Sequence, residues 1–187
     1  MMHFPLINKY YSSYASWKKN AKESYSTQWF RILEGDSFYS LEHSEDQVMI
    51  LATIEKKSIL LVKVKRMLLG DSTWELPAGG LEKNENVDAG ASREFLEETG
   101  IKIKDFTRFK TLPSFVLASN RMPMFPNIFQ IDLSKKDFDQ RSLHDNEIEK
   151  VEIFEFKKIK QMILDGELCA TLPIAVISRY LFQLEAK

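Results

Sequence analysis

Several acidic residues lie close together between positions 85 and 98, in a spacing that suits a metal ion. Glu94, Glu97 and Glu98 are three and four positions apart, and a helix turns about 100° per residue, so they would project from one arc of a helix. Carboxylates held this close repel one another, and a divalent cation that prefers oxygen ligands removes the repulsion. The spacing therefore predicts a metal site, with Mg²⁺ as the expected ion and Mn²⁺ as the alternative.

The segment from 86 to 99 carries the end signals of a helix. Asn86 is a suitable N-cap, Asp88 suits the positive end of the helix dipole, and Gly100 can take the left-handed conformation that ends a helix. Gly90 lies in the middle, where it costs about 0.5–1 kcal/mol relative to Ala. It either leaves room for metal or phosphate or marks a tolerant position.

The fixed positions extend beyond this helix. Residues 79–101 read GGLEKNENVDAGASREFLEETGI. They fit the pattern G-x5-E-x7-R-E-U-x-E-E-x-G-U, where U is a bulky apolar residue. Within it Arg93 is expected to pair with Glu85 or Glu97 and to hold the loop against the helix, as support for a metal cluster. The pattern is the Nudix box, so the chain resembles the Nudix hydrolases, which cut diphosphates that link a nucleoside to another group.

The resemblance implies how the site binds metal and phosphate. The backbone carbonyl of Ala78 would coordinate metal together with the three glutamates of the helix. Gly79 and Gly80 would let phosphate approach the backbone closely. Arg93 would belong to the catalytic group.

A general base for the attacking water is also implied by the resemblance. In the pyrophosphatases of this family it comes from an acidic loop before a late strand, which corresponds here to residues 144–149. Glu147 and Glu149 are the two candidates, and His144 beside them is expected to be a surface residue. Glu98 is the alternative base, as in some Nudix branches.

The residues before the box resemble the ADP-ribose pyrophosphatase type. Residues 75–79 read ELPAG, and Arg66 ends the preceding strand where that group has a substrate-contacting arginine, so Arg66 and Glu75 are expected to face the substrate. The implied reaction is Mg²⁺-dependent cleavage of ADP-ribose or a related nucleoside diphosphate sugar into a nucleoside monophosphate and a sugar phosphate. The alternatives are a Nudix hydrolase for a dinucleoside polyphosphate or an oxidised nucleotide, and a non-catalytic module that senses nucleotide sugars.

Composition narrows the class of protein. The chain has 187 residues, a net charge of −1 and 44% hydrophobic residues, which suits one core and gives no reason to expect nucleic acid or a membrane surface as a partner. Cys169 is the single cysteine, so no internal disulfide is possible. No apolar run reaches the length of a membrane span, and the N-terminus lacks the layout of a signal peptide, so a cytoplasmic protein is expected.

The remaining pattern predicts an α+β fold. Residues 1–28 form an N-terminal arm, either irregular or a helix that needs a partner surface, and residues 29–187 form the Nudix domain. By resemblance, two short strands within residues 29–45 would exchange between the subunits of a homodimer. Apolar runs predict a hairpin of strands around residues 55–57, later strands and two C-terminal helices, with residues 67–73 as a loop. The arrangement expected from the resemblance is a Nudix-type α/β/α sandwich with a mixed sheet, and its segments are strands at 29–33, 37–41, 47–54, 58–64, 106–112, 127–133 and 151–156 and helices at 86–99, 157–164 and 172–184.

Overall fold

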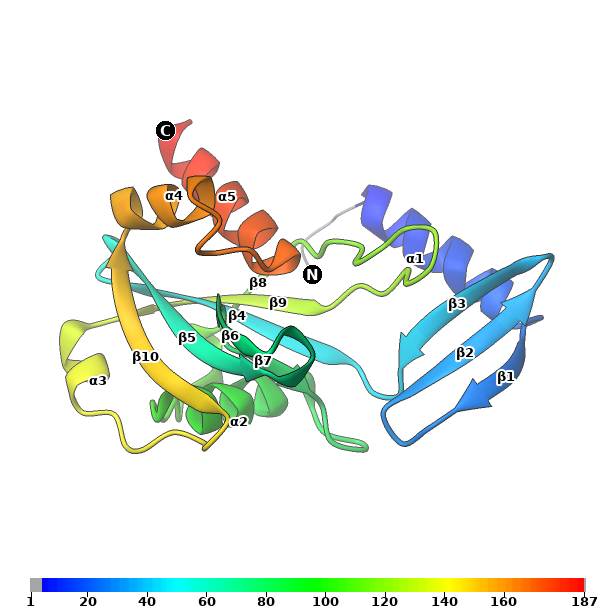
Figure 1. Ribbon diagram of the computed structural model, residues 1–187, viewed down its shortest axis with the longest axis horizontal. Coiled ribbons are helices and arrows are strands. Elements are labelled where there is room, and N and C mark those ends of the chain that lie inside the picture. The colour runs from blue at the N-terminus through cyan, green and yellow to red at the C-terminus, as the bar shows by residue number, and fades with distance from the viewer. Residues whose placement is uncertain (1–4, 187) are drawn as a thin grey trace.

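The computed structural model describes residues 5–186. Residues 1–4 of the predicted arm and Lys187 at the end of the predicted domain lie outside that range. Figure 1 shows a large body, in which a sheet lies between helices, and beside it a smaller unit of three strands and one helix.

A seven-stranded mixed sheet forms the large body. Its strands run in the order β10-β5-β4-β9-β8, with β6 added beside β5 and β7 beside β4. The β4–β9 pair is parallel and the other pairs are antiparallel. The strands are β4 (Gln47–Ile54), β5 (Ser58–Arg66), β6 (Asp71–Glu75), β7 (Ala78–Gly80), β8 (Lys110–Leu112), β9 (Asn127–Leu133) and β10 (Ile148–Glu155).

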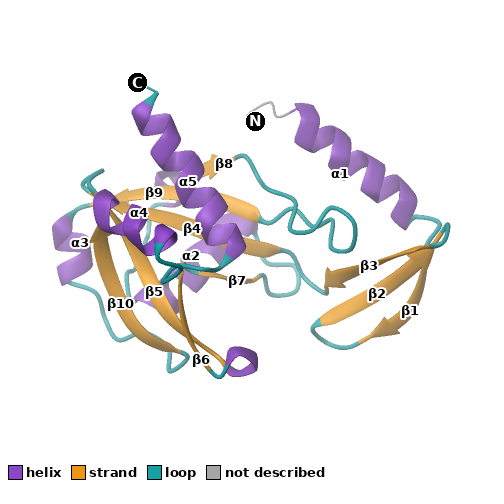
Figure 2. Cartoon of the chain, turned by 45° about the horizontal axis from the view of Figure 1, so that its top comes forward, coloured by secondary structure: helices purple, strands orange, loops and turns teal. Residues whose placement is uncertain are grey.

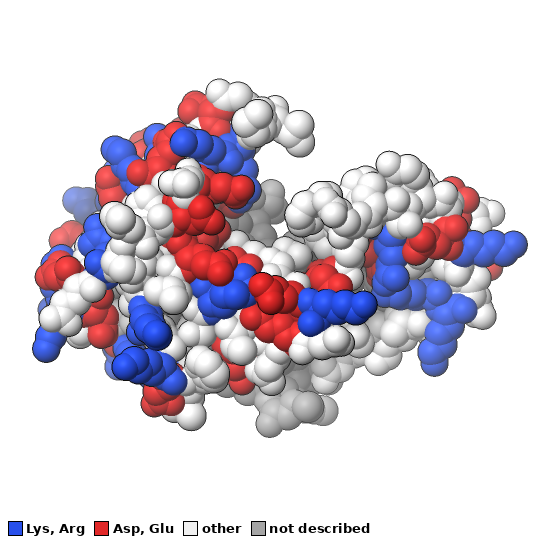
Figure 3. Space-filling view, turned by 90° about the horizontal axis from the view of Figure 1, so that it is seen from below, with Lys and Arg blue, Asp and Glu red and all other residues white. Residues whose placement is uncertain are grey.

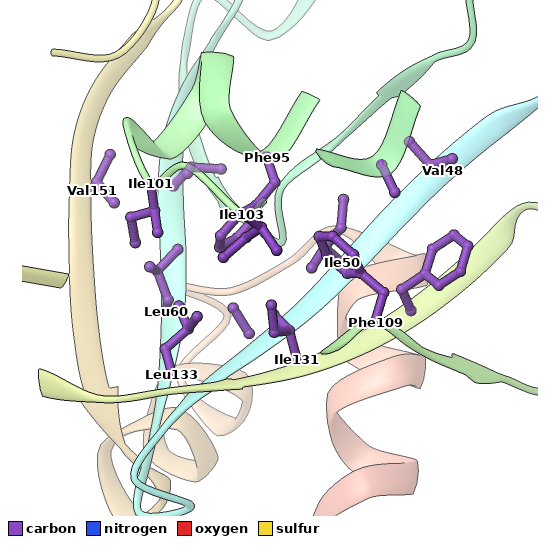
Figure 4. Close-up of a cluster of buried hydrophobic side chains, with 14 of the residues drawn as sticks. Val48, Ile50, Leu60, Phe95, Ile101, Ile103, Phe109, Ile131, Leu133 and Val151 are labelled. Carbon is purple, nitrogen blue, oxygen red and sulfur yellow. The ribbon is translucent and has the colours of Figure 1, made fainter. Parts of the chain in front are cut away.

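The sheet is covered by helices on both faces (Figure 2). Alternate residues of β4 point to opposite faces, and both sets are buried, which explains why this strand reads as one continuous apolar run. Ile50 packs in the cluster that contains Phe95 of α2 (Figure 4), whereas Leu51 packs in the cluster that contains Ile159 of α4 and Ile177 of α5. The predicted α+β fold and its α/β/α layering are confirmed, with α2 (Val87–Thr99) on one face and α4 (Phe156–Leu164) and α5 (Thr171–Glu185) on the other.

The two central strands form the predicted hairpin. Residues 55–57 connect the paired Ile54 and Ser58, and Glu55 and Lys56 turn the chain with left-handed φ values of 50° and 55°. A short helix, α3 (Lys135–Asp139), follows β9, and its Ser134 and Asp137 form a capping box.

The smaller unit contains the segment predicted as an arm. Residues 5–18 form helix α1 (Pro5–Lys18), which packs against the antiparallel sheet β1-β2-β3. The boundary expected at residue 28 falls between β1 and β2, two strands that pair with each other. The three strands are β1 (Lys22–Ser26), β2 (Phe30–Gly35) and β3 (Phe38–His43).

Two predicted segments were wrong. The loop expected at 67–73 is a 3₁₀ turn, Met67–Leu69, followed by strand β6, because Arg66 pairs with Asp71 and the chain folds back on β5. The strand expected at 106–112 begins with a 3₁₀ turn, Phe106–Arg108, and only its last three residues form β8.

No helix within residues 5–186 combines the length and the apolar composition that a membrane span requires.

Candidate active site

The end signals of the box helix act as predicted and fix its position. The Asn86 side chain accepts a hydrogen bond from the Asp88 backbone N–H, and Gly100, at φ 72°, caps the other end with its N–H on the Leu96 carbonyl. Ala91 and Phe95 are fully buried against the sheet. The helix therefore presents its glutamates on the other side, toward the loop that precedes it.

Arg93 joins that loop to the helix. Its guanidinium donates two hydrogen bonds to the Glu85 carboxylate, at 2.8 and 3.0 Å. It also donates to Glu94 at 2.9 Å, to Glu97 at 3.1 Å and to the Gly80 carbonyl at 2.9 Å. Both pairings expected for Arg93 are present, because a planar guanidinium can serve several acceptors around its rim.

Two glycines let the loop pack tightly on the helix. A Cβ on Gly79 would lie 2.1 Å from a carboxylate oxygen of Glu94, so Glu94 rests directly on the Gly79 backbone. A Cβ on Gly90 would lie 2.2 Å from Leu81 and 2.9 Å from a Glu85 oxygen. Gly90 thus makes room for two side chains of the box loop, which corrects both readings of it from the sequence.

Glu98 is the most perturbed acid of the site. Its carboxylate accepts a hydrogen bond of 2.9 Å from the Ala78 backbone N–H. Burial, with the like charges of Glu94 and Glu75 added, raises the pKa of Glu98 to about 8. Burial also raises the pKa of Glu94, against the opposing effect of Arg93.

Arg66 and Glu75 face each other across the β5–β6 hairpin. Two hydrogen bonds of 2.7 Å join the guanidinium to the carboxylate, in a bidentate pair. Both residues also act on Glu98, Arg66 lowering its pKa and Glu75 raising it. The sequence assigns both residues to the substrate but does not predict their pairing, because residues 67–73 are expected to form a loop.

The two candidate bases lie differently with respect to this site. The negative charge of Glu147 helps to raise the pKa of Arg66, so it is within electrostatic range of the arginine. Glu149 is exposed and lies at the register shift of β10, and its side chain makes no hydrogen bond or ion pair in the part of the chain that the structure describes. The His144 ring is partly exposed, and its Nδ1 atom lies 3.0 Å from the backbone carbonyl of its neighbour Asp145.

The carboxylates of the site are suitable ligands for a divalent cation, but their side chains are not yet placed around a common position. Among the described residues, no group of three or more acidic, histidine or cysteine side chains could hold a metal ion as it stands. Arg93 engages Glu94 and Glu97, and Glu97 is the more exposed, with 47% of its side chain accessible. Glu94 and Glu98 both have raised pKa values, the condition that a bound cation relieves.

Acidic and basic side chains lie beside one another on the face of the molecule seen in Figure 3. A cleft of about 700 Å³ opens next to the Arg66–Glu75 pair, and Cys169 and Thr171 lie on its other wall. Such a cleft is large enough for a nucleotide-sized ligand.

Comparison with known proteins agrees with this geometry. Part of the chain is similar to an ADP-ribose pyrophosphatase of Bacillus subtilis (strain 168), with 41% identity over 71 residues. It is also similar to an 8-oxo-dGTP diphosphatase of Buchnera aphidicola subsp. Schizaphis graminum, with 32% identity over 68 residues, and to a MutT-like protein of Streptomyces ambofaciens, with 35% identity over 57 residues. These alignments cover 36%, 36% and 30% of this chain and 38%, 52% and 36% of the relatives, so the chain spans about half or less of each relative's length. The NUDIX domain itself matches residues 43–169, more than half of the chain. The chain therefore belongs to the NUDIX domain family, the hydrolase family that its box predicts.

Proposed function

We propose that the protein is a Mg²⁺-dependent hydrolase that cuts the diphosphate of ADP-ribose or a related nucleoside diphosphate sugar. Water would add to one phosphorus, the bridging P–O bond would break, and a nucleoside monophosphate and a sugar phosphate would leave. The observation that carries the proposal is the complete box, in which the partly buried Glu98 has a raised pKa and feels the like charge of Glu94. The 41% identity to the B. subtilis pyrophosphatase supports the substrate class.

Each residue of the site has a part in this proposal. Glu94, Glu97 and Glu98, with the carbonyl of Ala78, would hold the ion. When bound, Mg²⁺ supplies positive charge to the phosphate oxygens and lowers the pKa of a coordinated water. Because Arg93 now engages Glu97, that carboxylate has to turn away from the guanidinium to reach an ion.

The loop and the hairpin would position the substrate. Gly80 has no side chain to hinder a phosphate, whereas the space beside Gly79 is filled by Glu94. The Arg66–Glu75 pair borders the neighbouring cleft. We propose Glu147 as the general base, because of the two candidates in the loop it is the one whose charge acts on Arg66. Glu149 and Glu98 are the alternatives that the experiment below separates.

A second candidate function has its own support. The relative named 8-oxo-dGTP diphosphatase is 32% identical over 68 residues. An oxidised nucleoside triphosphate would use the same box, because the reaction again replaces a bridging P–O bond by water. A non-catalytic nucleotide-sugar sensor is the third candidate, and the retention of every box glutamate speaks against it.

We also propose that the protein is a cytoplasmic homodimer, formed through strands within residues 29–45. Trp29 and Phe38 expose 72% and 63% of their surface, as aromatic residues at protein interfaces do before association. The exposed free thiol of Cys169 suits a reducing compartment. In this proposal residues 29–187 form the Nudix domain and the preceding segment an appended arm.

One substrate screen tests the proposal. Purified protein with Mg²⁺ is offered ADP-ribose, ADP- and UDP-sugars, dinucleoside polyphosphates and oxidised nucleoside triphosphates, and the products are identified by mass. Release of AMP and ribose 5-phosphate from ADP-ribose supports the leading function; preference for the triphosphate selects the second. No turnover of any of them, with nucleotide sugars still bound, selects the sensor.

The bases are separated by paired variants. Glu147→Gln is expected to lower kcat at least about tenfold more than Glu149→Gln, because general bases contribute on the order of a hundredfold or more. Equal, mild effects of the two variants would discard both and leave Glu98 as the candidate base.

A further inference from the structure

Arg179 is a partly buried cation that pairs with no acidic side chain among the described residues. Its Nη2 atom is inaccessible to solvent and has no hydrogen-bond partner among the described residues. Burial lowers the pKa of this guanidinium, and no acidic group offsets the effect. A buried charged donor without an acceptor costs free energy, so the position calls for an acceptor from outside.

The surroundings of Arg179 are arranged to receive one. The guanidinium stacks 4.3 Å from the centre of the Phe115 ring, and Arg179 is one of the residues that line the adjoining hollow. A hollow of about 450 Å³ lies beside it, and Ser178 and Gln183 add a hydroxyl and an amide to its lining. None of the residues that line this hollow is acidic, and Phe182, 67% exposed, gives it an apolar rim.

Other stacked arginines of the chain show what is missing here. Arg141 stacks 4.1 Å from the Phe138 ring, and its Nη1 donates to the Phe138 carbonyl at 3.0 Å. Arg121 stacks 4.3 Å from the Tyr39 ring and donates to the Asn120 carbonyl at 2.7 Å. Stacking on a ring therefore does not by itself leave an arginine without an acceptor.

We propose that the hollow on α5 is a second ligand site, which binds the phosphate or carboxylate of a small organic anion with an apolar body. Arg179 pairs with the oxyanion, Gln183 and Ser178 donate to it, and the Phe115 and Phe182 rings contact the rest of the ligand. The site is separate from the box, because α5 and α2 lie on opposite faces of the sheet (Figures 1 and 2). It does not depend on the diphosphatase activity proposed above.

The test observes the arginine side chains of ¹⁵N-labelled, metal-free protein by NMR, with the Arg179 Nε–H signal assigned from its loss in Arg179→Met. Phenyl phosphate, benzoate and inorganic phosphate are the probes, and benzyl alcohol is the uncharged control. We expect phenyl phosphate, benzoate or both to shift the Arg179 signal saturably, which also distinguishes phosphate from carboxylate recognition. Benzyl alcohol should leave the signal in place.

Variants separate a ligand role from a structural one. Arg179→Met should weaken binding of the active probe at least about tenfold, given the strength of charge-assisted hydrogen bonds. It should keep or raise the melting temperature of the ligand-free protein, since an unbalanced buried charge is removed. Arg141→Met is the matched control and should bind the probe as the wild type does.

Several results would overturn the site. They are shifts confined to Arg66 and Arg93, a response to benzyl alcohol equal to that of the anions, or undiminished binding by Arg179→Met. If Arg179→Met does not fold, Arg179→Lys provides the assignment, and the wild-type titration still decides.

Discussion

Two clusters of charged side chains, one in each part of the molecule, have opposite proportions of acid and base. In the small unit a single carboxylate, Glu42, 5% exposed, accepts hydrogen bonds from Tyr14, Lys18 and Arg31, each at 2.8 Å. These bonds outweigh burial and lower the pKa of Glu42. The Glu42 cluster is complete, and it holds α1 to β2 and β3.

In the box cluster, by contrast, the carboxylates have too few cations and hydrogen-bond donors. Arg93 is its central cation, but it serves Glu85, Glu94 and Glu97 and leaves Glu98 with one backbone hydrogen bond. Its carboxylates with raised pKa values need positive charge from outside the chain. The comparison teaches that an excess of like charge inside a fold indicates a ligand, whereas a balanced cluster indicates a structural role.

Neutralising one acid of each cluster tests most directly whether the two clusters have different roles. Glu98→Gln keeps the shape of the side chain and removes its charge, so we expect turnover of the preferred substrate with Mg²⁺ to fall at least about a hundredfold. Glu42→Gln should keep the wild-type kcat. Initial-rate assays of both variants measure the contrast, and an unchanged rate in Glu98→Gln would remove that residue from the mechanism.

A second test concerns the close approach of loop and helix. Gly79→Ala places a methyl group where Glu94 now lies, so we expect kcat/KM to fall on the order of ten- to a hundredfold. In Gly80→Ala the new methyl meets only the end of the flexible Gln47 side chain, at 3.2 Å, and the loss should be milder. Equal losses in the two variants would show that steric contact with Glu94 is not the cause.

Glu42→Gln also tests the structural half of the comparison. The substitution removes the negative charge and replaces one of the two acceptor oxygens by an NH2 donor. Lys18 and Arg31 then lose their counter-charge, and we expect the free energy of unfolding to fall by about 1–3 kcal/mol. Urea unfolding followed by circular dichroism measures the change. Lys135→Gln, which breaks an exposed pair with Asp139, is the control and should cost under about 1 kcal/mol.

The smallest expected effect is a difference in pH dependence. The folded pKa of Glu98, about 8, lies above its usual value of 4.5, so the folded state binds more protons than the unfolded state between these values. The metal-free protein should therefore lose stability as the pH rises from about 5 to 8, and Glu98→Gln should reduce that loss. Glu42 has the opposite sign: its contribution is present above pH 4.5 and is lost in acid. Melting temperatures across the pH range would reveal both trends. If the melting temperature of Glu98→Gln fell as steeply as that of the wild type between about pH 5 and 8, the first trend would be contradicted.

How much the sequence predicted depended on how local the cause was. The box helix was predicted to within a residue at each end, because its caps Asn86 and Gly100 act on their own neighbours. The pairing of Arg66 with Glu75 was missed, because their long side chains meet only once β6 has folded back on β5, where Arg66 lies opposite Asp71 and Glu75 opposite Val62. Helix α1 could not be assigned, since Tyr14 and Lys18 find their partner Glu42 more than 20 positions away.

The further site shows the same limit. Arg179 lies in an amphipathic helix that the sequence predicted correctly, but the residues next to it in the sequence do not indicate a ligand site. Its lack of an acceptor becomes visible only once Phe115, from a distant segment, covers it.

The multiple attachments of Arg93 limit where the specificity of this protein can change. One guanidinium fastens Gly80, Glu85, Glu94 and Glu97 to each other, so the box loop and the box helix respond to any replacement as a single rigid piece. A variant that accepts a different substrate yet retains full turnover must therefore be altered outside that piece. The hairpin that carries Arg66 and the loop that carries Glu147 are the places where laboratory selection for new substrates should concentrate its changes.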